Sequence, residues 1–420
     1  MRTIKTKTSR IVNEKTLIAT VDIGKVKHTG YYRCPDGTDV RPFEFFNNAH
    51  GFQKFWEGIV QTMSAHDLKD VVIGFESTGP YAEPLIHYLR KRPVRLVQVN
   101  PMHTKRLKEL QGNSPNKTDQ KDPKVIADII ELGHALSLVV PEGPAAELRR
   151  LTQARERSMK RRTALFNQLQ HLVFVVFPEF LQVMKNLKTQ SAKYLLKHYP
   201  TPQDILEYDL ESMACSLRKI SRGKVSRERV KALYTAAQDS VGIQQGQEGI
   251  VFEITNLLHM IEVSECFIAD VEQKMSSLLG QIPYSRSILS IKGIGEVTAA
   301  GLIGEVGDFR QFNTISEITK LAGLDLFEIS SGKHKGHRRI SKRGRPLLRK
   351  FLFLAVLSMV SPSGILRQTY QRYLQRGMLK MKALVAMTRK LLRIIFALVR
   401  DQSEYVDGYT KTKNVLTVAA

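Results

Sequence analysis

The sequence has few cysteines and no long apolar run. Cys34, Cys215 and Cys266 are odd in number and far apart, which fits neither a disulfide framework nor a zinc knuckle, so we expect ordinary buried thiols. The best apolar stretch, Phe351 to Val360, has ten residues, whereas a membrane-spanning helix needs about 20. Residues Met1 to Lys15 lack the apolar stretch of a secretory signal. We therefore expect a cytoplasmic protein without a membrane segment.

Acidic residues are also in deficit. The chain has 420 residues, with 64 Lys and Arg against 40 Asp and Glu, which gives a net charge of +24. Such an excess of positive charge suits a polyanionic partner. With 42% apolar residues at this length, the chain supports two or three hydrophobic cores. It is predicted to be a folded, multi-domain protein.

The first third of the chain alternates between β-rich runs and helical stretches. Leu17 to Val21, His28 to Arg33 and Val40 to Phe46 read as three strands joined by hairpins, because Cys34-Pro35-Asp36-Gly37 supplies turn chemistry. Further strands are expected at Val71 to Phe75 and Val94 to Val99, with helices between them. This pattern predicts an α/β domain with a sheet of at least five strands.

After Pro141-Glu142-Gly143-Pro144 the pattern becomes helical. Glu147 to Arg162 carries seven Arg or Lys and two Glu, which predicts a basic helix. Apolar residues recur at alternating spacings of three and four between Ile250 and Leu278, which is typical of a coiled-coil seam. A second copy of the chain, an antiparallel helix of the same chain, or the core under one long helix would each produce this stripe. Residues 180 to 245 carry no motif that assigns a role.

Four carboxylates stand out. Asp22 and Glu76 each end a predicted strand, and Gly24 would permit a ligand to approach Asp22 closely. Asp119 and Asp122 are spaced to share one face of a helix, although Pro123 also allows Asp122 to be the N-cap of a helix from Pro123 to Leu132. Clustered carboxylates repel one another unless a cation neutralises them. Hard oxygen ligands select Mg²⁺, with Mn²⁺ as the alternative.

The C-terminal third is basic and helical. Ile291 to Gly295 followed by an apolar run is typical of a helix-hairpin-helix turn, where backbone N–H groups meet a phosphate, although a plain tight turn also fits. Between Lys333 and Lys350 there are nine Lys or Arg and no acid, and Ser331 precedes this run. Nearby cations would stabilise an attacking alkoxide. We expect nucleic-acid contacts from Lys292, Gly293, Gly295, Lys333, Lys335, Arg338, Arg339, Lys342 and Arg343.

Together these residues resemble the DEDD transposases of the insertion-sequence one-ten family, which include bridge-RNA-guided recombinases and, more distantly, the pilin-gene invertase. The motifs that carry the resemblance are ordered and widely spaced: Val21-Asp22-Ile23-Gly24-Lys25, Glu76-Ser77-Thr78-Gly79-Pro80-Tyr81, Asn100-Pro101, Lys117-Thr118-Asp119-Gln120-Lys121-Asp122, Gly293-Ile294-Gly295, Leu321-Ala322-Gly323-Leu324, Ser331-Gly332 and Arg339-Ile340-Ser341-Lys342-Arg343-Gly344.

The resemblance implies an α/β plus α protein. Its parts would be a basic tail (1–15), a RuvC-like, ribonuclease H-like metal-binding domain with a mixed sheet (16–140), a helical linker and coiled coil with an insertion (145–283), a C-terminal transposase domain with the helix-hairpin-helix-like turn (285–402), and a tail (403–420). Asp22, Glu76, Asp119 and Asp122 would hold Mg²⁺, and Ser331 would form a covalent link to DNA.

The resemblance also implies partners. These are donor and target DNA, a non-coding bridge RNA, and further copies of the chain in a dimer or tetramer where one subunit's metal site works with another's serine. The protein would be a nucleoid-associated recombinase of a prokaryote. An actin-like sugar kinase is disfavoured, because the second half lacks suitable glycine-rich phosphate loops. A metal-dependent junction nuclease that uses water, and a basic nucleic-acid scaffold without catalysis, stay open.

Overall fold

The computed structural model describes residues 12–76, 79–111, 122–328, 336 and 338–407. The chain forms two compact units, Met1–Val139 and Val140–Ala420. The five-part division of the chain stays a prediction. Among the described residues, no helix has both the length and the apolar character that a membrane crossing requires.

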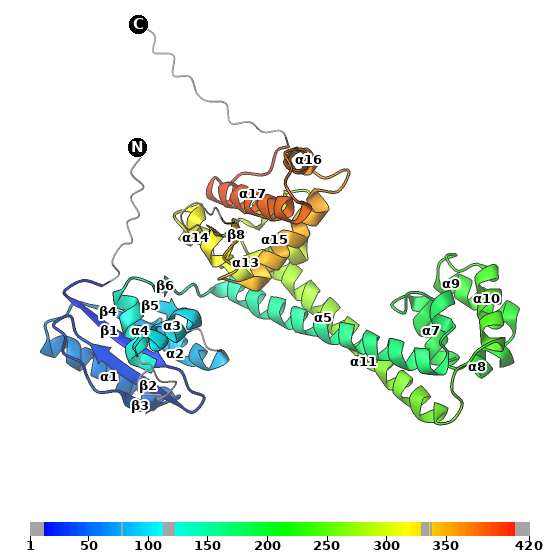
Figure 1. Cartoon of the computed structure of the whole chain (residues 1–420), viewed down its shortest axis with the longest axis horizontal. Helices are drawn as coiled ribbons and strands as arrows, with labels where there is room; N and C mark the ends of the chain where they lie inside the picture. The colour runs from blue at the N-terminus through cyan, green and yellow to red at the C-terminus, as the bar shows by residue number, and fades with distance from the viewer. Residues whose placement is uncertain (1–11, 77–78, 112–121, 329–335, 337, 408–420) are drawn as a thin grey trace, which may run out of the picture. The chain divides into compact units, whose positions relative to one another are not determined.

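The N-terminal unit is built on one mixed sheet, whose strands are labelled in Figure 1. Its six strands lie in the order β3-β2-β1-β4-β5-β6. Strands β1, β4 and β5 run parallel, while β2, β3 and β6 pair antiparallel with their neighbours. The predicted mixed sheet is therefore confirmed, and it is compatible with a ribonuclease H-like domain. The bounds are β1 Thr16–Asp22, β2 Lys27–Arg33, β3 Phe43–Phe46, α1 Ala49–Ala65, β4 Asp70–Glu76, η1 Pro80–Ala82, α2 Glu83–Leu89, β5 Arg95–Val99, α3 Pro101–Gln111, α4 Asp122–Glu131 and β6 Leu136–Ser137.

Two apolar cores cover the two faces of this sheet. Leu17, Ala19 and Val21 of β1 pack with residues of α1 and α2, whereas Ile18 packs with residues of α4. This separation follows from the alternation of side chains along a strand. Strand β3 begins later than predicted, after Pro42, because proline has no N–H to donate to the sheet.

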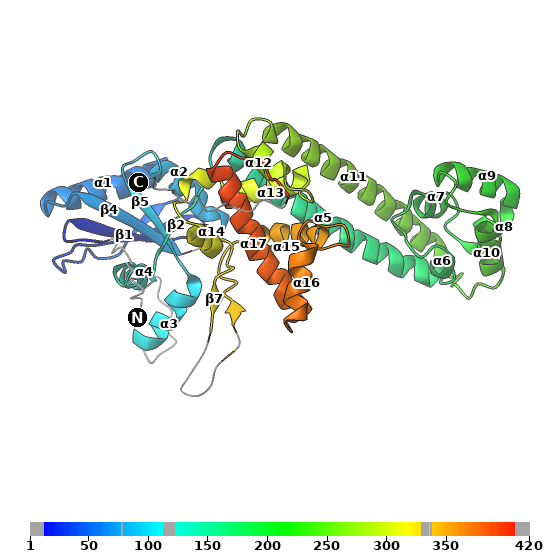
Figure 2. The same cartoon turned by 90° about the horizontal axis from the view of Figure 1, so that it is seen from above.

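The C-terminal unit contains two long helices that lie side by side in both views (Figures 1 and 2). Helix α5 carries the predicted basic stretch, and α11 carries the predicted apolar seam. The bounds are α5 Gly143–Val176, α6 Phe180–Val183, α7 Gln190–His198, α8 Pro202–Glu207, α9 Leu210–Ile220, α10 Arg227–Gln238, α11 Gln247–Leu279, α12 Ser285–Leu289, α13 Glu296–Val306, η2 Phe309–Gln311, α14 Ile315–Leu321, β7 Leu326–Phe327, β8 Arg339–Ile340, α15 Pro346–Met359, α16 Arg367–Gln375 and α17 Lys380–Arg400.

The seam of α11 is buried within the chain. Ile254, Ile261, Ile268 and Met275 are all buried, and α5 packs along this helix. Of the three sources that the stripe allowed, the antiparallel helix of the same chain is the one found. The seam therefore gives no support to self-association.

Each end of this helix pair joins a separate core. At one end, residues of α5 and α11 pack with helices α6 to α10, so the segment that carried no motif is a small helical bundle. At the other end they pack with helices α12 to α17. The apolar stretch that begins at Phe351 lies in α15, a helix of 14 residues whose buried side chains include Phe351 and Leu352.

The expectation of buried thiols is right for Cys34 and wrong for two cysteines. Cys215 and Cys266 are exposed. Each lies on the outer face of an amphipathic helix. The buried residues beside Cys215 are Met213 and Leu217 of α9, and those beside Cys266 are Ser264 and Ile268 of α11, so the cysteines fall between the inward-facing positions. Periodicity would have placed both outside the cores.

Candidate functional site

Asp22 and Glu76 lie at the same edge of the sheet. They are the last residues of β1 and β4, which are neighbouring parallel strands with Val21 opposite Phe75. The next pair in that register is Asp22 and Glu76. The two acids are therefore neighbours at the carboxyl ends of adjacent strands, which is where open α/β sheets bind their ligands.

Both acids also share a face of the sheet, the one that α4 covers. On β1, the buried hydroxyl of Thr20 donates to the carbonyl of Pro123 at 2.7 Å. On β4, a Cβ added to Gly74 would come within 2.2 Å of Cδ1 of Ile130. Because side chains alternate along a strand, Asp22 follows Thr20 and Glu76 follows Gly74 onto this face.

Asp122 begins α4 on the same face. Its carboxylate is buried, and Lys108 of α3 forms an ion pair with it. The Thr20–Pro123 hydrogen bond fixes the first turn of α4 two residues from Asp22 along β1. Asp122 is the first helical residue, and the proline that follows it fits into the first turn. The Asp122 carboxylate contacts Lys108 through the ion pair described above.

Asp128, a further acid of α4, lies away from Asp22 and Glu76. Its carboxylate accepts a hydrogen bond from Arg33 at 2.6 Å, and Arg33 is opposite Ile18 on β1. That position is toward the other end of the strand. Helix α4 therefore runs away from the acidic edge, by which we mean the end of the sheet that carries Asp22, Glu76 and Asp122.

The structure explains the glycine at position 24 by the backbone of a turn, and not by the approach of a ligand. A Cβ at this position would come within 2.0 Å of the carbonyl oxygen of Lys27, and its N–H donates to Nδ1 of His28 at 3.2 Å. The turn between β1 and β2 thus requires the glycine for its own closure. Room for a ligand is not needed to explain it.

Asp119 and Ser331, together with Lys333 and Lys335, lie outside the described residues. The chain on both sides of Ser331 is described: β7 and β8 pair antiparallel, with Phe327 opposite Arg339. Past β8, the backbone N–H of Lys342 donates to the carbonyl of Gly323 at 2.9 Å. The described residues on the C-terminal side of Ser331 are thereby hydrogen-bonded to the chain that follows α14.

The remaining basic candidates are solvent-exposed but separated. Arg338, Arg339, Lys342 and Arg343 precede the first turn of α15 and are exposed. Gly293, beside exposed Lys292, lies against Met359 at the last turn of the same helix. A helix of 14 residues is about 21 Å long. The glycine turn and the basic run therefore lie at opposite ends of α15.

The turn itself has the geometry of a tight connection between helices. Gly293 has φ +104°, a conformation that side chains rarely adopt, and Gly295 is the N-cap of α13. Ile291 and Ile294 are buried beneath it. A helix-hairpin-helix role for this turn stays a prediction.

Known proteins match both units. A model of the DEDD transposases of IS110 matches residues 19–178, and a model of the transposase IS116/IS110/IS902 family matches residues 285–371. Together they match more than half of the chain. The 43.6 kDa protein of insertion element IS110 from Streptomyces coelicolor is 23% identical over 92% of this chain and 94% of its own length.

This chain belongs to the IS110 family of transposases. Two further relatives agree. The 42 kDa protein of insertion element IS900 from Mycobacterium paratuberculosis is 25% identical over 69% of this chain and 73% of its own length. The pilin gene-inverting protein of Moraxella lacunata is 30% identical over 30% of this chain and 40% of its own length. The chain is thus a DNA transposase or site-specific recombinase.

The acidic edge of this transposase has the donor chemistry for a divalent metal. Asp22, Glu76 and Asp122 offer only carboxylate oxygens, the ligands that hard cations prefer. Asp122 is buried and already balanced by one cation, the ammonium of Lys108. Within the described ranges, these three acids do not close into one compact group of ligand atoms. The chemistry of these three side chains fits a hard divalent cation. Asp119 lies outside the described residues.

Sequence reasoning missed Lys108 and Thr20. Lys108 looks like one of several cations on a basic helix, and only the packing of α3 against α4 brings it to Asp122. Thr20 interrupts an apolar strand, which is a signal that was available. A buried hydroxyl requires a partner, and here that partner positions α4.

Proposed function

We propose that this transposase cuts and rejoins DNA with a serine nucleophile assisted by Mg²⁺, guided by a non-coding RNA. The observation that carries the proposal is the meeting of Asp22 and Glu76 at the ends of two adjacent parallel strands, on the face where α4 starts with Asp122. A structural scaffold has no need to gather carboxylates at one edge. Transposases of the DEDD type generally use a divalent metal, which agrees with this arrangement.

The acids would bind the ion, and their neighbours would hold them in position. Asp22, Glu76, Asp119 and Asp122 are the proposed ligands, with Mg²⁺ favoured and Mn²⁺ as a substitute. A bound ion would polarise the scissile phosphate and offset charge on the leaving oxygen. Thr20 anchors the start of α4. Lys108 balances Asp122 before a metal arrives.

Ser331 would perform the covalent step. Its Oγ forms a bond to the scissile phosphorus, the bond from phosphorus to the leaving DNA oxygen breaks, and that oxygen takes up a proton. A hydroxyl of the partner strand then attacks the phosphoserine and releases Ser331, so no external energy source is required. The exposed cations before, within and after β8, which are Arg338, Arg339, Lys342 and Arg343, supply positive charge near this segment.

Trapping on labelled DNA tests the serine. The wild-type protein should give a covalent protein–DNA adduct that survives denaturation, and Ser331→Ala should give none. Ser330→Ala is the matched control, since it removes the neighbouring hydroxyl. An adduct with Ser331→Ala that equals the wild-type adduct refutes the nucleophile. Free ends without any adduct would instead favour a junction nuclease that acts by hydrolysis.

Metal titration tests the acids separately. Asp22→Asn and Glu76→Gln should each weaken Mn²⁺ binding, measured by calorimetry, by more than tenfold, because each removes a charged ligand. Asp70→Asn is the control: Asp70 is an exposed acid on β4, at the other end of the strand from Glu76. Equal binding by all four proteins would remove the acidic edge from the mechanism.

Partners form the last part of the proposal. The family relation implies DNA substrates, and the excess charge of +24 also suits a structured RNA. Sequencing the RNA that co-purifies with the full chain is the test, and recovery of only random host RNA would contradict a guide. Copies of the chain would assemble into a dimer or tetramer.

A further inference from the structure

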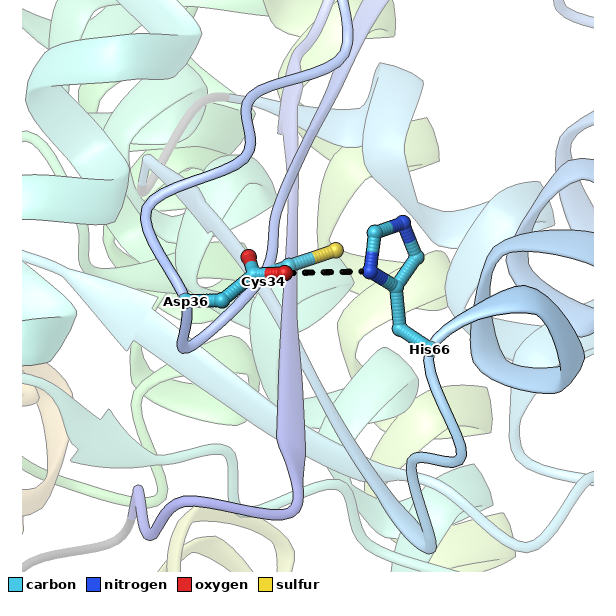
Figure 3. Close-up of side chains that lie close together, drawn as sticks. All are labelled: Cys34, Asp36 and His66. Carbon is cyan, nitrogen blue, oxygen red and sulfur yellow. Dashed lines mark hydrogen bonds and ion pairs between the residues drawn. The ribbon is translucent and has the colours of Figure 1, made fainter.

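A second group of metal-binding side chains lies outside the acidic edge. Cys34 follows β2, Asp36 lies in the turn after it, and His66 is the C-cap of α1. In Figure 3 the sulfur of Cys34 and the carboxylate of Asp36 both lie beside the imidazole of His66. Among the parts of the chain that the structure describes, this is the one compact group of three such donors.

The distances suit a tetrahedral ion. The donor atoms lie within 4.8 Å of one another, and His66 Nδ1 is 3.2 Å from a carboxylate oxygen of Asp36. Zinc bond lengths of about 2.0–2.3 Å at tetrahedral angles place neighbouring ligand atoms about 3.3–3.6 Å apart. One edge of the tetrahedron is therefore nearly formed. The Cys34 sulfur lies within 4.8 Å of the other two donor atoms, so it would move toward them by at most about 1.3 Å to reach zinc-ligand spacing.

The backbone on both sides of the group is already fixed. The N–H of Cys34 donates to the carbonyl of Thr38 at 3.0 Å, and the N–H of Thr38 donates to Oδ1 of Asp36 at 2.9 Å. On the other side, the N–H of His66 donates to the carbonyl of Thr62 at 3.2 Å. The ligands would thus lose little conformational freedom on binding, which favours a preformed site.

We propose that Cys34, Asp36 and His66 form a Zn²⁺ site, with water as the fourth ligand. Mixed sulfur, nitrogen and oxygen donors suit zinc, whereas Mg²⁺ prefers oxygen alone. The sheet register separates this site from the acidic edge, because Arg33 lies opposite Ile18 while Thr29 lies opposite Asp22. The two sites are at opposite ends of β1 and select different ions.

The site would clamp the turn between β2 and β3 onto the end of α1. A cysteine binds zinc as the thiolate, so zinc binding would release a proton from Cys34.

Metal binding by the full chain tests the site. After treatment with a chelator and dialysis against zinc, the wild-type protein should retain one tightly bound zinc ion. Cobalt in its place should give the charge-transfer absorption of a thiolate ligand. Cys34→Ser should remove that absorption and weaken zinc binding by more than about 100-fold, a larger loss than is caused by removing a residue that only hydrogen-bonds to a ligand.

Two controls keep the result interpretable. The double variant Cys215→Ser, Cys266→Ser removes the exposed thiols and should bind zinc like the wild type. Asp36→Asn keeps the shape of the turn and should weaken binding while the chelated protein melts at nearly the wild-type temperature. A Cys34→Ser protein with unchanged zinc affinity, or a cobalt spectrum without a thiolate band, overturns the proposal.

Discussion

In the absence of a metal ion, Lys108 is predicted to neutralise part of the negative charge of the acidic edge. Its ammonium pairs with Asp122, whose side chain is 9% exposed, and the Lys108 side chain is 33% exposed. Breaking a fully buried ion pair costs about 3–5 kcal/mol, since it leaves a charge without a partner. Because water reaches the lysine, we discount this to about 1–2 kcal/mol for Lys108→Met.

Thermal unfolding with and without Mg²⁺ measures this cost. In chelator, Lys108→Met should lower the melting temperature of the N-terminal unit by about 3–6 °C. Saturating Mg²⁺ should restore much of that loss, because a cation again balances Asp122, and the gain from Mg²⁺ should exceed that of the wild type.

Two variants make this prediction specific. Lys105→Met alters the same helix at an exposed lysine, 4.0 Å from Glu109, and should cost less than about 0.5 kcal/mol. Adding Asp122→Asn to Lys108→Met should recover stability in chelator, because no uncompensated charge then remains. If Lys108→Met is as stable as Lys105→Met, or if Mg²⁺ stabilises both equally, the reasoning about Asp122 is wrong.

Two further perturbations address the neighbourhood of Asp22. Gly74→Ala should destabilise the unit by about 1–3 kcal/mol in chemical denaturation, because its Cβ would meet Cδ1 of Ile130 at 2.2 Å. Ile130→Val lacks that atom and should rescue the variant; failure to rescue would argue against this clash. Burial lowers the pKa of His28 below its ordinary value of 6.5, so stability should fall as the pH drops below about 6.5, where the unfolded chain binds the proton more readily. His28→Asn keeps an acceptor for the N–H of Gly24 and should lose this dependence, measured as a difference from the wild type between pH 5 and 8.

The acidic edge could be predicted from the sequence in outline. Asp22 and Glu76 each end a run of residues with β propensity, and a polar residue at such a point marks the end of a strand. Which strands pair is a long-range property, and only the structure shows that β1 and β4 are parallel neighbours. The face that the acids share was equally hidden. It depends on which residues of each strand meet α4.

Contacts between distant segments account for what the sequence left out. Cys34 and His66 come together only after α1 packs on the sheet, and neither belongs to a recognisable metal-binding spacing. Sequence reasoning treated the three cysteines alike, although only one is buried. The turn at Cys34 was read correctly, but its partner across α1 was not visible.

The apolar stripe of α11 shows the same limit and leads to a last prediction. A seam reports that a helix has a partner but not which partner, and α5 of the same chain covers it, with Arg155 bound to Glu272 at 2.6 Å. Any assembly through this helix must therefore use its other face. Phe252, Met260, Val263 and Phe267 are exposed there, at spacings that form a second stripe.

A second copy of the chain is the partner that this outer stripe would take, because such a face can pair with itself about a twofold axis. Phe252→Lys with Phe267→Lys should convert the proposed oligomer to monomer in light scattering, while the melting temperature stays within about 2 °C, since neither side chain is in the core. The matched control is Thr255→Lys with Asn256→Lys, which adds the same charge to exposed positions of α11 without removing apolar surface. Equal dissociation by both variants would point to charge repulsion, whereas a monomeric wild type, or no dissociation by either variant, would contradict pairing through this stripe.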